Sequence, residues 1–363
     1  MKLTDVVNRI NGNVDRFTTD LEYYIGGEHF ESCELEIFNR GLIKPNLNIL
    51  GFKFHFAFQE RDVIFMARNP HLRKAGMVLF AGLCSDASYI LRSKDENILT
   101  QEYLAVMLQS DHFWDYCEAH KVGSVNFAIN WKTLANYEFD LPSLEKQNEI
   151  SEKVWSAYRL KKSYKKLIEA TDEMVKSQFI EMFGNPLSSI QKNELKRLGD
   201  CCHINPRRSN VSLNENDLVS FVPMPAVNEN GYIDGATDEE YGKVKKGFTY
   251  FENDDVLFAK ITPCMENGKG AVAEGLTNGI GMGSTEFHIL RPITGISNPY
   301  WLLALTRMPI FRERAAKNMS GTGGQRRVGS AFLENFMIGL PSISEQDTFE
   351  AIYKQADKSK FEL

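Results

Sequence analysis

The stretch Leu141-Pro142-Ser143-Leu144-Glu145-Lys146-Gln147 returns 199 residues later, with three changes, as Leu340-Pro341-Ser342-Ile343-Ser344-Glu345-Gln346. A second pair of segments lies at nearly the same separation, since Arg61–Phe65 is similar to Asp254–Phe258 at an offset of 193. Offsets that stay almost constant along a chain indicate an internal duplication. The sequence therefore predicts two divergent copies of one domain.

The duplication divides the chain into four parts. We expect a first globular domain at 1–143, a long helix at 144–186, a second globular domain at 187–342 and the start of a second long helix at 343–363. Short strand-like runs mixed with helices predict an α/β (α+β) fold for each globular domain. The expected strands include 52–58, 77–80, 256–259 and 287–290, and the expected helices are 101–119 and 299–317.

The segment between the copies predicts one long helix. From Glu145 to Met182 the chain contains no Gly or Pro, and Gly184 and Pro186 then supply a stop. About 38 residues at 1.5 Å each would span roughly 57 Å. A heptad stripe on this helix predicts pairing with another helix. Its members are Ile150, Val154, Ala157, Lys161, Tyr164, Ile168, Thr171, Val175, Gln178 and Met182.

The same pattern restarts after the second copy. Phe349, Tyr353 and Ala356 match Ile150, Val154 and Ala157. We therefore expect the two long helices to pair, in antiparallel fashion, and to hold the globular domains apart.

Composition narrows the class of protein. The chain has 363 residues, and no apolar run approaches the roughly 18 residues of a membrane span. Its six cysteines include no Cys-x-x-Cys pair, which favours a reduced cytoplasm. The sequence predicts neither a metal site nor a cofactor.

Charge is unevenly distributed. The net charge of −6 argues mildly against nucleic-acid binding. Between Trp301 and Ser330, however, six basic residues face a single acid, Glu313. Phosphate contacts act over roughly a Debye length, so a local cluster matters more than the sum.

At this point the chain resembles the specificity subunit of Type I restriction–modification systems. The resemblance covers nearly the whole chain and rests on order, spacing and duplication together. The segments that carry it are Leu141–Ile150 with its echo at Leu340–Gln346, the helix end Ser177–Asn185, the strand Asp255–Lys260 and the Gly-rich loop Gly321–Val328.

The resemblance implies a DNA-binding protein without catalytic residues. Two target-recognition domains would each read one half of a split DNA sequence, mainly in the major groove. The long helices would set the gap between the halves and bind methyltransferase subunits. Restriction subunits would join through the complex, and no membrane would be involved. Half-sites about one helical turn apart, roughly 34 Å, would suit a spacer of this length.

The candidate DNA contacts differ between the copies. In the second copy, Gly321, Gly323 and Gly324 would let backbone approach phosphate beside three donors in the same loop. The residues expected to contact DNA are Arg68, Asn69, Arg73, Lys74, Ser124 and Asn126 in the first copy, and Lys245, Lys246, Lys260, Thr262, Lys269, Gln325, Arg326 and Arg327 in the second. The first copy lacks Gln and Arg in its loop, which fits two copies that read different sequences.

Three other functions compete with DNA recognition. A methyltransferase would need an Asn/Asp-Pro-Pro-Tyr motif and a Gly-x-Gly-x-x-Gly loop, and Asn298-Pro299-Tyr300 lacks the second Pro. A nuclease would need a second acid where Ala259 stands. The remaining alternative is a non-catalytic scaffold or antiviral regulator of the same layout that binds protein partners and not DNA.

Overall fold

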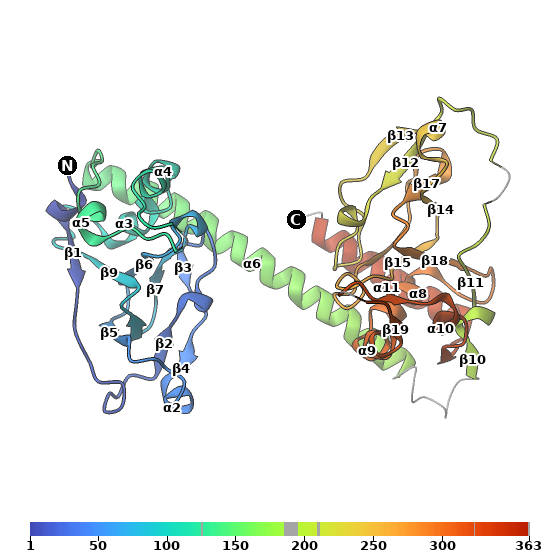
Figure 1. The fold of residues 1–363 in the computed structure, drawn as a ribbon, viewed down its shortest axis with the longest axis horizontal. Helices are drawn as coiled ribbons and strands as arrows, with labels where there is room; N and C mark the ends of the chain where they lie inside the picture. The colour runs from blue at the N-terminus through green and yellow to red at the C-terminus, as the bar shows by residue number, and fades with distance from the viewer. Residues whose placement is uncertain (125, 185–194, 209–210, 323, 362–363) are drawn as a thin grey trace. The chain divides into compact units, whose positions relative to one another are not determined.

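The computed structural model describes residues 1–124, 126–184, 195–208, 211–322 and 324–361. Figure 1 shows the chain, which divides into two compact units, unit 1 (Met1–Lys165) and unit 2 (Lys166–Leu363). The expected start of the second copy, residue 187, lies outside the described residues. Mixed strands and helices in both units confirm the α/β (α+β) fold class.

Unit 1 contains two sheets. The larger has the strand order β1-β9-β6-β7-β3, with β3 and β7 parallel, and the smaller has the order β4-β2-β8-β5, with β2 and β8 parallel. The strands are β1 (Val7–Ile10), β2 (Tyr23–Ile25), β3 (Glu36–Ile37), β4 (Gly41–Leu42), β5 (Phe54–Phe58), β6 (Val63–Met66), β7 (Ala75–Val78), β8 (Gly82–Ser85) and β9 (Ser88–Ser93).

Strand β6 shows how the layers of unit 1 form. Side chains alternate between the faces of a strand. Val63 and Phe65 join a core with the helices, whereas Ile64 and Met66 join a core shared with the smaller sheet. Unit 1 is therefore a stack of helices, larger sheet and smaller sheet.

The predicted helix at 101–119 is divided in two. The side chain of Ser110 accepts a hydrogen bond from the Phe113 backbone N–H and so begins a new helix. The helices of unit 1 are α1 (Leu3–Val6), α2 (Ile43–Asn46), α3 (Gln101–Met107), α4 (Asp111–Ala119) and α5 (Trp131–Ala135), with 3₁₀ turns η1 (Gly27–His29) and η2 (Pro70–Leu72).

Unit 2 repeats this arrangement. Its sheets have the orders β11-β18-β15-β16 and β13-β12-β17-β14, and β12 pairs with β17 in parallel as β2 does with β8. Its strands are β10 (Leu195–Arg197), β11 (Cys202–Ile204), β12 (Leu218–Val222), β13 (Thr237–Glu240), β14 (Thr249–Glu252), β15 (Val256–Ala259), β16 (Gly270–Val272), β17 (Ile280–Gly283), β18 (Phe287–Pro292), β19 (Met319–Ser320), β20 (Arg327–Val328) and β21 (Met337–Gly339).

The predicted helix at 299–317 is also divided in two. Met308 is extended, with φ −61° and ψ 136°, because a residue before proline is disfavoured in the helical region and Pro309 follows it. The helices of unit 2 are α7 (Tyr241–Val244), α8 (Pro299–Arg307), α9 (Pro309–Lys317), α10 (Ser330–Glu334) and α11 (Ile343–Phe361), with 3₁₀ turns η3 (Leu198–Asp200), η4 (Met224–Ala226) and η5 (Thr277–Gly279).

Each larger sheet carries the same buried ion pair. Arg92 Nε lies 2.7 Å from Asp62 Oδ1 in unit 1, and Arg291 Nε lies 2.7 Å from Asp255 Oδ1 in unit 2. Both aspartate side chains are 1% exposed. A buried carboxylate needs such a partner, because an unpaired charge in the protein interior is costly. The pair therefore ties β6 to β9 and β15 to β18.

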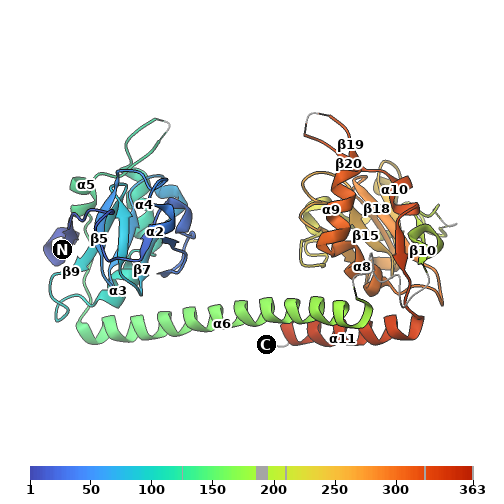
Figure 2. The ribbon, with the colours of Figure 1, turned by 90° about the horizontal axis from the view of Figure 1, so that it is seen from below.

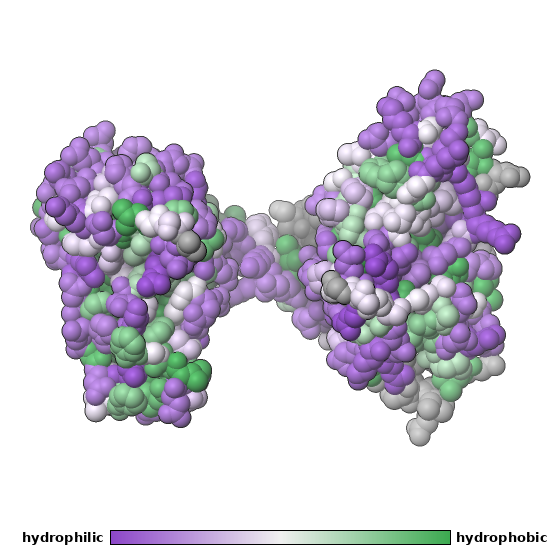
Figure 3. Space-filling model, viewed as in Figure 1, coloured by the Kyte–Doolittle hydropathy of each residue, from purple (hydrophilic) through white to green (hydrophobic). Residues whose placement is uncertain are grey.

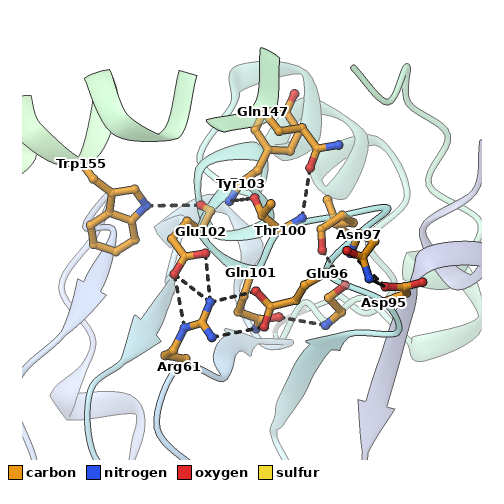
Figure 4. Close-up of polar contacts among 12 residues, drawn as sticks. Arg61, Asp95, Glu96, Asn97, Thr100, Gln101, Glu102, Tyr103, Gln147 and Trp155 are labelled. Atoms are coloured by element: carbon orange, nitrogen blue, oxygen red, sulfur yellow. Dashed lines mark hydrogen bonds and ion pairs between the residues drawn. The ribbon is translucent and has the colours of Figure 1, made fainter. Parts of the chain in front are cut away.

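A buried glutamine joins each globular layer to its long helix. Gln147 Oε1 accepts the Thr100 backbone N–H at 3.0 Å, and its Nε2 donates to the carbonyls of Ile98 and Pro142 (Figure 4). Gln346 makes the same three bonds in unit 2, with Asn298, Ile296 and Pro341. Thr100 and Asn298 are the N-caps of α3 and α8, so each joint fixes a helix start.

The long helix is continuous, as predicted. Helix α6 (Leu144–Phe183) has 40 residues, or about 60 Å at 1.5 Å per residue. Gly184 follows it in the left-handed region at φ 68°, and its N–H donates to the Ile180 carbonyl at 2.7 Å. Glycine adopts that conformation without strain, so it ends the helix.

The face of α6 that unit 1 buries is not the predicted heptad stripe. Its buried residues are Gln147, Ser151, Trp155 and Tyr158, one position away from the stripe. Trp155 Nε1 donates to the Glu102 carbonyl at 3.3 Å (Figure 4). The stripe residues Val154, Ala157, Tyr164 and Ile168 are exposed, and Ile150 is half-buried. The globular domain packs against the neighbouring face because the large aromatic side chains of α6, Trp155 and Tyr158, lie there and become buried.

Unit 2 brings the end of α6 against α11. Phe349, Tyr353 and Ala356 are buried in one core with Val175, Phe179 and Phe183, while Met182 packs at its edge. The ring centroid of Phe349 lies 5.2 Å from that of Phe179 and 5.7 Å from that of Phe183. Figure 2 shows α11 running antiparallel to this part of α6.

In Figure 3 most of the visible surface is hydrophilic, with scattered hydrophobic residues. Among the described residues, we find no helix long and apolar enough to cross a bilayer.

Asp255→Ala should destabilise unit 2. It leaves Arg291 without its main partner, and breaking a buried ion pair costs about 3–5 kcal/mol. We expect the lower end, about 3 kcal/mol, because Arg291 keeps Glu252 at 3.1 Å. Urea unfolding would measure this loss, with hydrogen exchange locating it in residues 249–292. The control Asp234→Ala removes an exposed carboxylate and should change stability by less than about 0.5 kcal/mol. Equal stability of the two variants would contradict the role of the pair.

Candidate nucleic-acid interface

A hairpin in unit 2 carries the predicted Gly-rich loop. Strands β19 and β20 pair Ser320 with Arg327, and the turn between them includes Gln325 and Arg326. Gly321 has φ 133°, and a Cβ there would lie 2.4 Å from the Gln325 carbonyl oxygen. Only glycine fits this turn. Gly323, which we also expected to contact DNA, lies outside the described residues.

The base of this hairpin continues the larger sheet. The Val328 N–H donates to the Lys260 carbonyl at 2.9 Å, and the Thr262 N–H donates to the Arg326 carbonyl at 3.0 Å. The end of β15 and the hairpin are therefore one element. This contact places Lys260 and Thr262 beside Arg326 and Arg327. That these residues contact DNA, with Gln325 in the turn, stays a prediction.

Each arginine of the hairpin has a carboxylate partner. Arg327 Nη2 lies 2.8 Å from Glu286 Oε1, and its Nε lies 2.9 Å from Glu286 Oε2. Arg326 Nη2 lies 3.2 Å from Glu266 Oε1. The hydrogen bonds from Arg327 hold the pKa of Glu286 below its usual value. Lys260 is half-buried, and burial lowers its pKa.

A buried histidine side chain contacts the backbone at the base of the hairpin. His288 Nε2 lies 2.8 Å from the Val328 carbonyl oxygen, and its Nδ1 lies within hydrogen-bond distance of the Asn205 side chain. Burial lowers the pKa of His288, so the neutral ring is favoured. A neutral ring that donates from Nε2 fits the carbonyl acceptor.

Unit 1 carries the same hairpin in the same register. The Ile129 N–H donates to the Ala67 carbonyl at 2.9 Å, and the Asn69 N–H donates to the Phe127 carbonyl at 2.8 Å. Tyr89 donates its hydroxyl to the Ile129 carbonyl at 3.0 Å, at the place where His288 contacts Val328. Gly123, with φ 112°, stands where unit 2 has Gly321.

The chemistry of the unit 1 hairpin is different. Ser124 and Asn126 are exposed in its turn, and Arg68 is exposed at its base. Among the described residues, no carboxylate lies within ion-pair distance of Arg68. Arg73 Nη1 is 2.6 Å from Asp111, and Lys74 Nζ donates to a backbone carbonyl at 2.9 Å, so these two cations are already engaged.

Two predicted contacts of unit 2 lie elsewhere. Lys245 and Lys246 follow α7, which Figure 1 shows at the end of unit 2 opposite β19. Lys245 forms an ion pair with Glu215. Sequence proximity to a predicted turn could not reveal which end of the domain carries that turn. Lys269 lies beside the end of β15, the strand that is hydrogen-bonded to the hairpin, because its carbonyl accepts the Ala259 N–H at 3.2 Å.

Sequence reasoning missed four residues around the hairpins. Glu266, Glu286 and His288 come from segments distant in sequence from the loop that they contact. Lys121 was overlooked, although it lies beside the unit 1 loop, where its Nζ is 4.5 Å from the Phe127 ring centroid and 2.6 Å from Glu118. A signal for Glu286 was present, since the acid stands directly before the expected strand at 287–290.

Comparison with known proteins finds a family match over the first part of the chain. Residues 1–170 match the family model described as Type I restriction modification DNA specificity domain. The EcoAI specificity subunit of Escherichia coli is 44% identical over 147 residues, which are 40% of this chain and 24% of that protein. The EcoEI specificity subunit of the same organism is 40% identical over 152 residues, which are 41% and 25%. The chain thus spans about a quarter of the length of these curated relatives.

A solved structure shows the same fold. The Type I restriction–modification system S subunit from M. genitalium matches with a TM-score of 0.60 over 99% of this chain and 89% of that chain. At 12% sequence identity this likeness concerns the fold alone.

Acidification should loosen unit 2 through His288. Its pKa in the folded protein is below its ordinary value of about 6.5, so its contribution to stability is complete above pH 6.5. That contribution falls at lower pH, because the unfolded chain then takes up a proton that the folded chain does not. From pH 7 to pH 5.5 we expect the wild type to lose more stability than His288→Gln. Urea unfolding at both pH values measures this. Equal losses would show that His288 does not titrate differently on folding.

Proposed function

We propose that this chain, whose residues 1–170 belong to the family of Type I restriction modification DNA specificity domains, is a DNA-sequence-reading subunit of a Type I restriction–modification complex. The observation that carries the proposal is the repeated hairpin, held in one register on two copies of one fold. A family match on the first copy, together with the same strand order in the second, supports the same task for both.

Each unit would read one half of a bipartite site. Arginine can make two hydrogen bonds to guanine, and asparagine or glutamine can make two to adenine, in the major groove. Unit 2 offers Gln325, Arg326 and Arg327 for this purpose, beside Lys260 and Thr262. Unit 1 offers Arg68 and Asn69 at the hairpin base, with Ser124 and Asn126 in the turn. Because the donors differ, the two half-sites would differ in sequence.

The chain would carry no chemistry of its own. Methyltransferase and restriction subunits would act at the DNA site that it selects, in the cytoplasm, and it would itself need no cofactor. The exposed stripe of α6, which includes Val154, Tyr164 and Ile168, is our candidate surface for the methyltransferase subunit. No observation favours the alternative of a scaffold that binds only proteins.

Arg326→Ala combined with Arg327→Ala should weaken binding to duplex DNA. Loss of a base contact costs about 1–3 kcal/mol, and loss of a phosphate contact lowers the salt dependence of binding by about one unit. The matched control is Arg197→Ala, which removes an exposed arginine that pairs with Asp200. Affinities for a random-sequence duplex at two salt concentrations measure the loss of phosphate contacts, and sequences selected from a randomised pool measure the loss of base contacts.

The outcomes of this experiment separate the possible functions. Unchanged affinity together with an unchanged selected sequence in the double variant would remove the hairpin from the interface. If the wild type fails to bind DNA even beside a methyltransferase subunit, the scaffold alternative would replace DNA recognition.

Two substitutions on α6 should affect different properties, one the capture of the methyltransferase subunit and the other the stability of unit 2. Ile168 is 40% exposed, so Ile168→Asp should leave folding intact and reduce capture of the methyltransferase subunit. Val175 is 8% exposed in the core of unit 2, so Val175→Asp should destabilise that unit by at least about 3 kcal/mol. Co-purification and urea unfolding measure the two effects.

A third variant serves as the control for α6. Ser163→Asp introduces the same charge at an exposed position outside the stripe and should change neither assembly nor stability. Normal capture by Ile168→Asp would show that the stripe is not the docking surface.

A further inference from the structure

We propose that Lys260, Glu286 and Arg327 form a specificity-determining triad in unit 2, in which Glu286 positions Arg327 to read one guanine. This inference rests on the proposed function and deepens it. It names one base contact in one half-site. Glu286 is a positioning residue, because it would act through Arg327 and not by touching DNA.

Glu286 holds one edge of the Arg327 guanidinium. A guanidinium has five N–H donors in a fixed plane. Glu286 occupies one edge of that plane with contacts of 2.9 Å to Nε and 2.8 Å to Nη2. This geometry leaves three N–H groups, two on Nη1 and one on Nη2. Nη1 makes one long contact, 3.4 Å to the Gln325 carbonyl. The free edge therefore retains the two donors that the O6 and N7 atoms of guanine accept.

The backbone of Glu286 is itself held by two hydrogen bonds. The Glu286 carbonyl accepts the Lys260 N–H at 2.9 Å, and the Glu286 N–H donates to Ser284 Oγ at 3.2 Å. Its backbone is thus fixed beside the end of β15. An arginine side chain loses considerable rotamer freedom when it is ordered, so a side chain already oriented binds with a smaller entropy cost.

The charge of Glu286 also acts on a second cation. The Lys260 ammonium is affected by the charges of both Glu286 and Arg327. Without Glu286, two positive groups would remain at the hairpin base with no negative charge of that residue to offset them. They would attract the phosphates of any duplex, because backbone contacts carry no sequence information. The acid should therefore raise the preference for the correct base and lower the affinity for random DNA.

Unit 1 lacks all three members of the triad. Its matching backbone bonds are those of Ile129 to the Ala67 carbonyl and of Ala67 to the Ala87 carbonyl, at 2.9 Å each. This register places Ala67, Ala87 and Ala128 where unit 2 has Lys260, Glu286 and Arg327. The fold therefore does not need the triad, and its three members change together between the copies. That is the pattern expected of a reading element and not of a scaffold.

The duplication supplies a variant with a known structural precedent. Lys260→Ala combined with Glu286→Ala and Arg327→Ala gives unit 2 the residues of unit 1, so its hairpin should still form. Glu286→Ala alone removes the positioning residue, and Arg327→Lys keeps the charge without the planar fork. The matched control is Asp200→Ala, which removes the carboxylate partner of Arg197 and leaves the triad intact.

The experiment selects bound sequences from a pool of randomised duplexes, using the full chain with and without its methyltransferase subunit. We expect the wild type to select a guanine at one position that the triple variant, Glu286→Ala and Arg327→Lys all relax. The other half-site should be unchanged. Glu286→Ala should also bind unselected duplexes several-fold more tightly, whereas Asp200→Ala should keep the guanine. Circular dichroism would confirm that each variant is folded.

The possible results distinguish this inference from the proposed function. If the wild type selects a bipartite sequence that the three triad variants leave unchanged, the triad does not read DNA and the proposed function stands. Loss of a whole half-site in folded Glu286→Ala would also overturn the inference, because one oriented arginine accounts for one position. If the wild type selects no sequence in either condition, the proposed function itself fails.

Discussion

A buried glutamine side chain joins each globular unit to its long helix. Gln147 and Gln346 each accept a backbone N–H from a helix N-cap and donate to two carbonyls. A buried polar group left unpaired costs about 1–3 kcal/mol, so a sliding or rotating helix would lose several bonds at once. Within each unit the long helix is therefore fixed to the layer that supports the larger sheet. The base of the hairpin is hydrogen-bonded to that same sheet, so its position on the unit is fixed as well.

Comparison of the two copies shows which interactions both share and which side chains differ. The buried Asp–Arg pair, the glutamine joint and the hairpin register occur in both. The side chains at the hairpin do not. Tyr89 and His288 support equivalent carbonyls with different chemistry, and three alanines replace the charged triad. The fold can thus keep its core while the side chains at the hairpin change.

Much of the architecture could be predicted from the sequence, because duplication and long helices leave periodic signals. The long helix and the strands at 256–259 and 287–290 followed from such patterns. The buried face of α6 did not, because the heptad pattern cannot show that Trp155 meets a globular domain. The site was predicted in part. Arg326 and Arg327 stood in a loop with a visible composition, whereas Glu286 meets Arg327 from a segment 41 residues away.

We propose that two copies of one domain read two different half-sites. Co-expression of the chain with a methyltransferase subunit, followed by genome-wide mapping of modified adenines, would show the recognised sequence in full. We expect one bipartite sequence in which two unlike specified segments flank a gap of fixed length. A single uninterrupted motif, or modification without any sequence preference, would contradict this proposal.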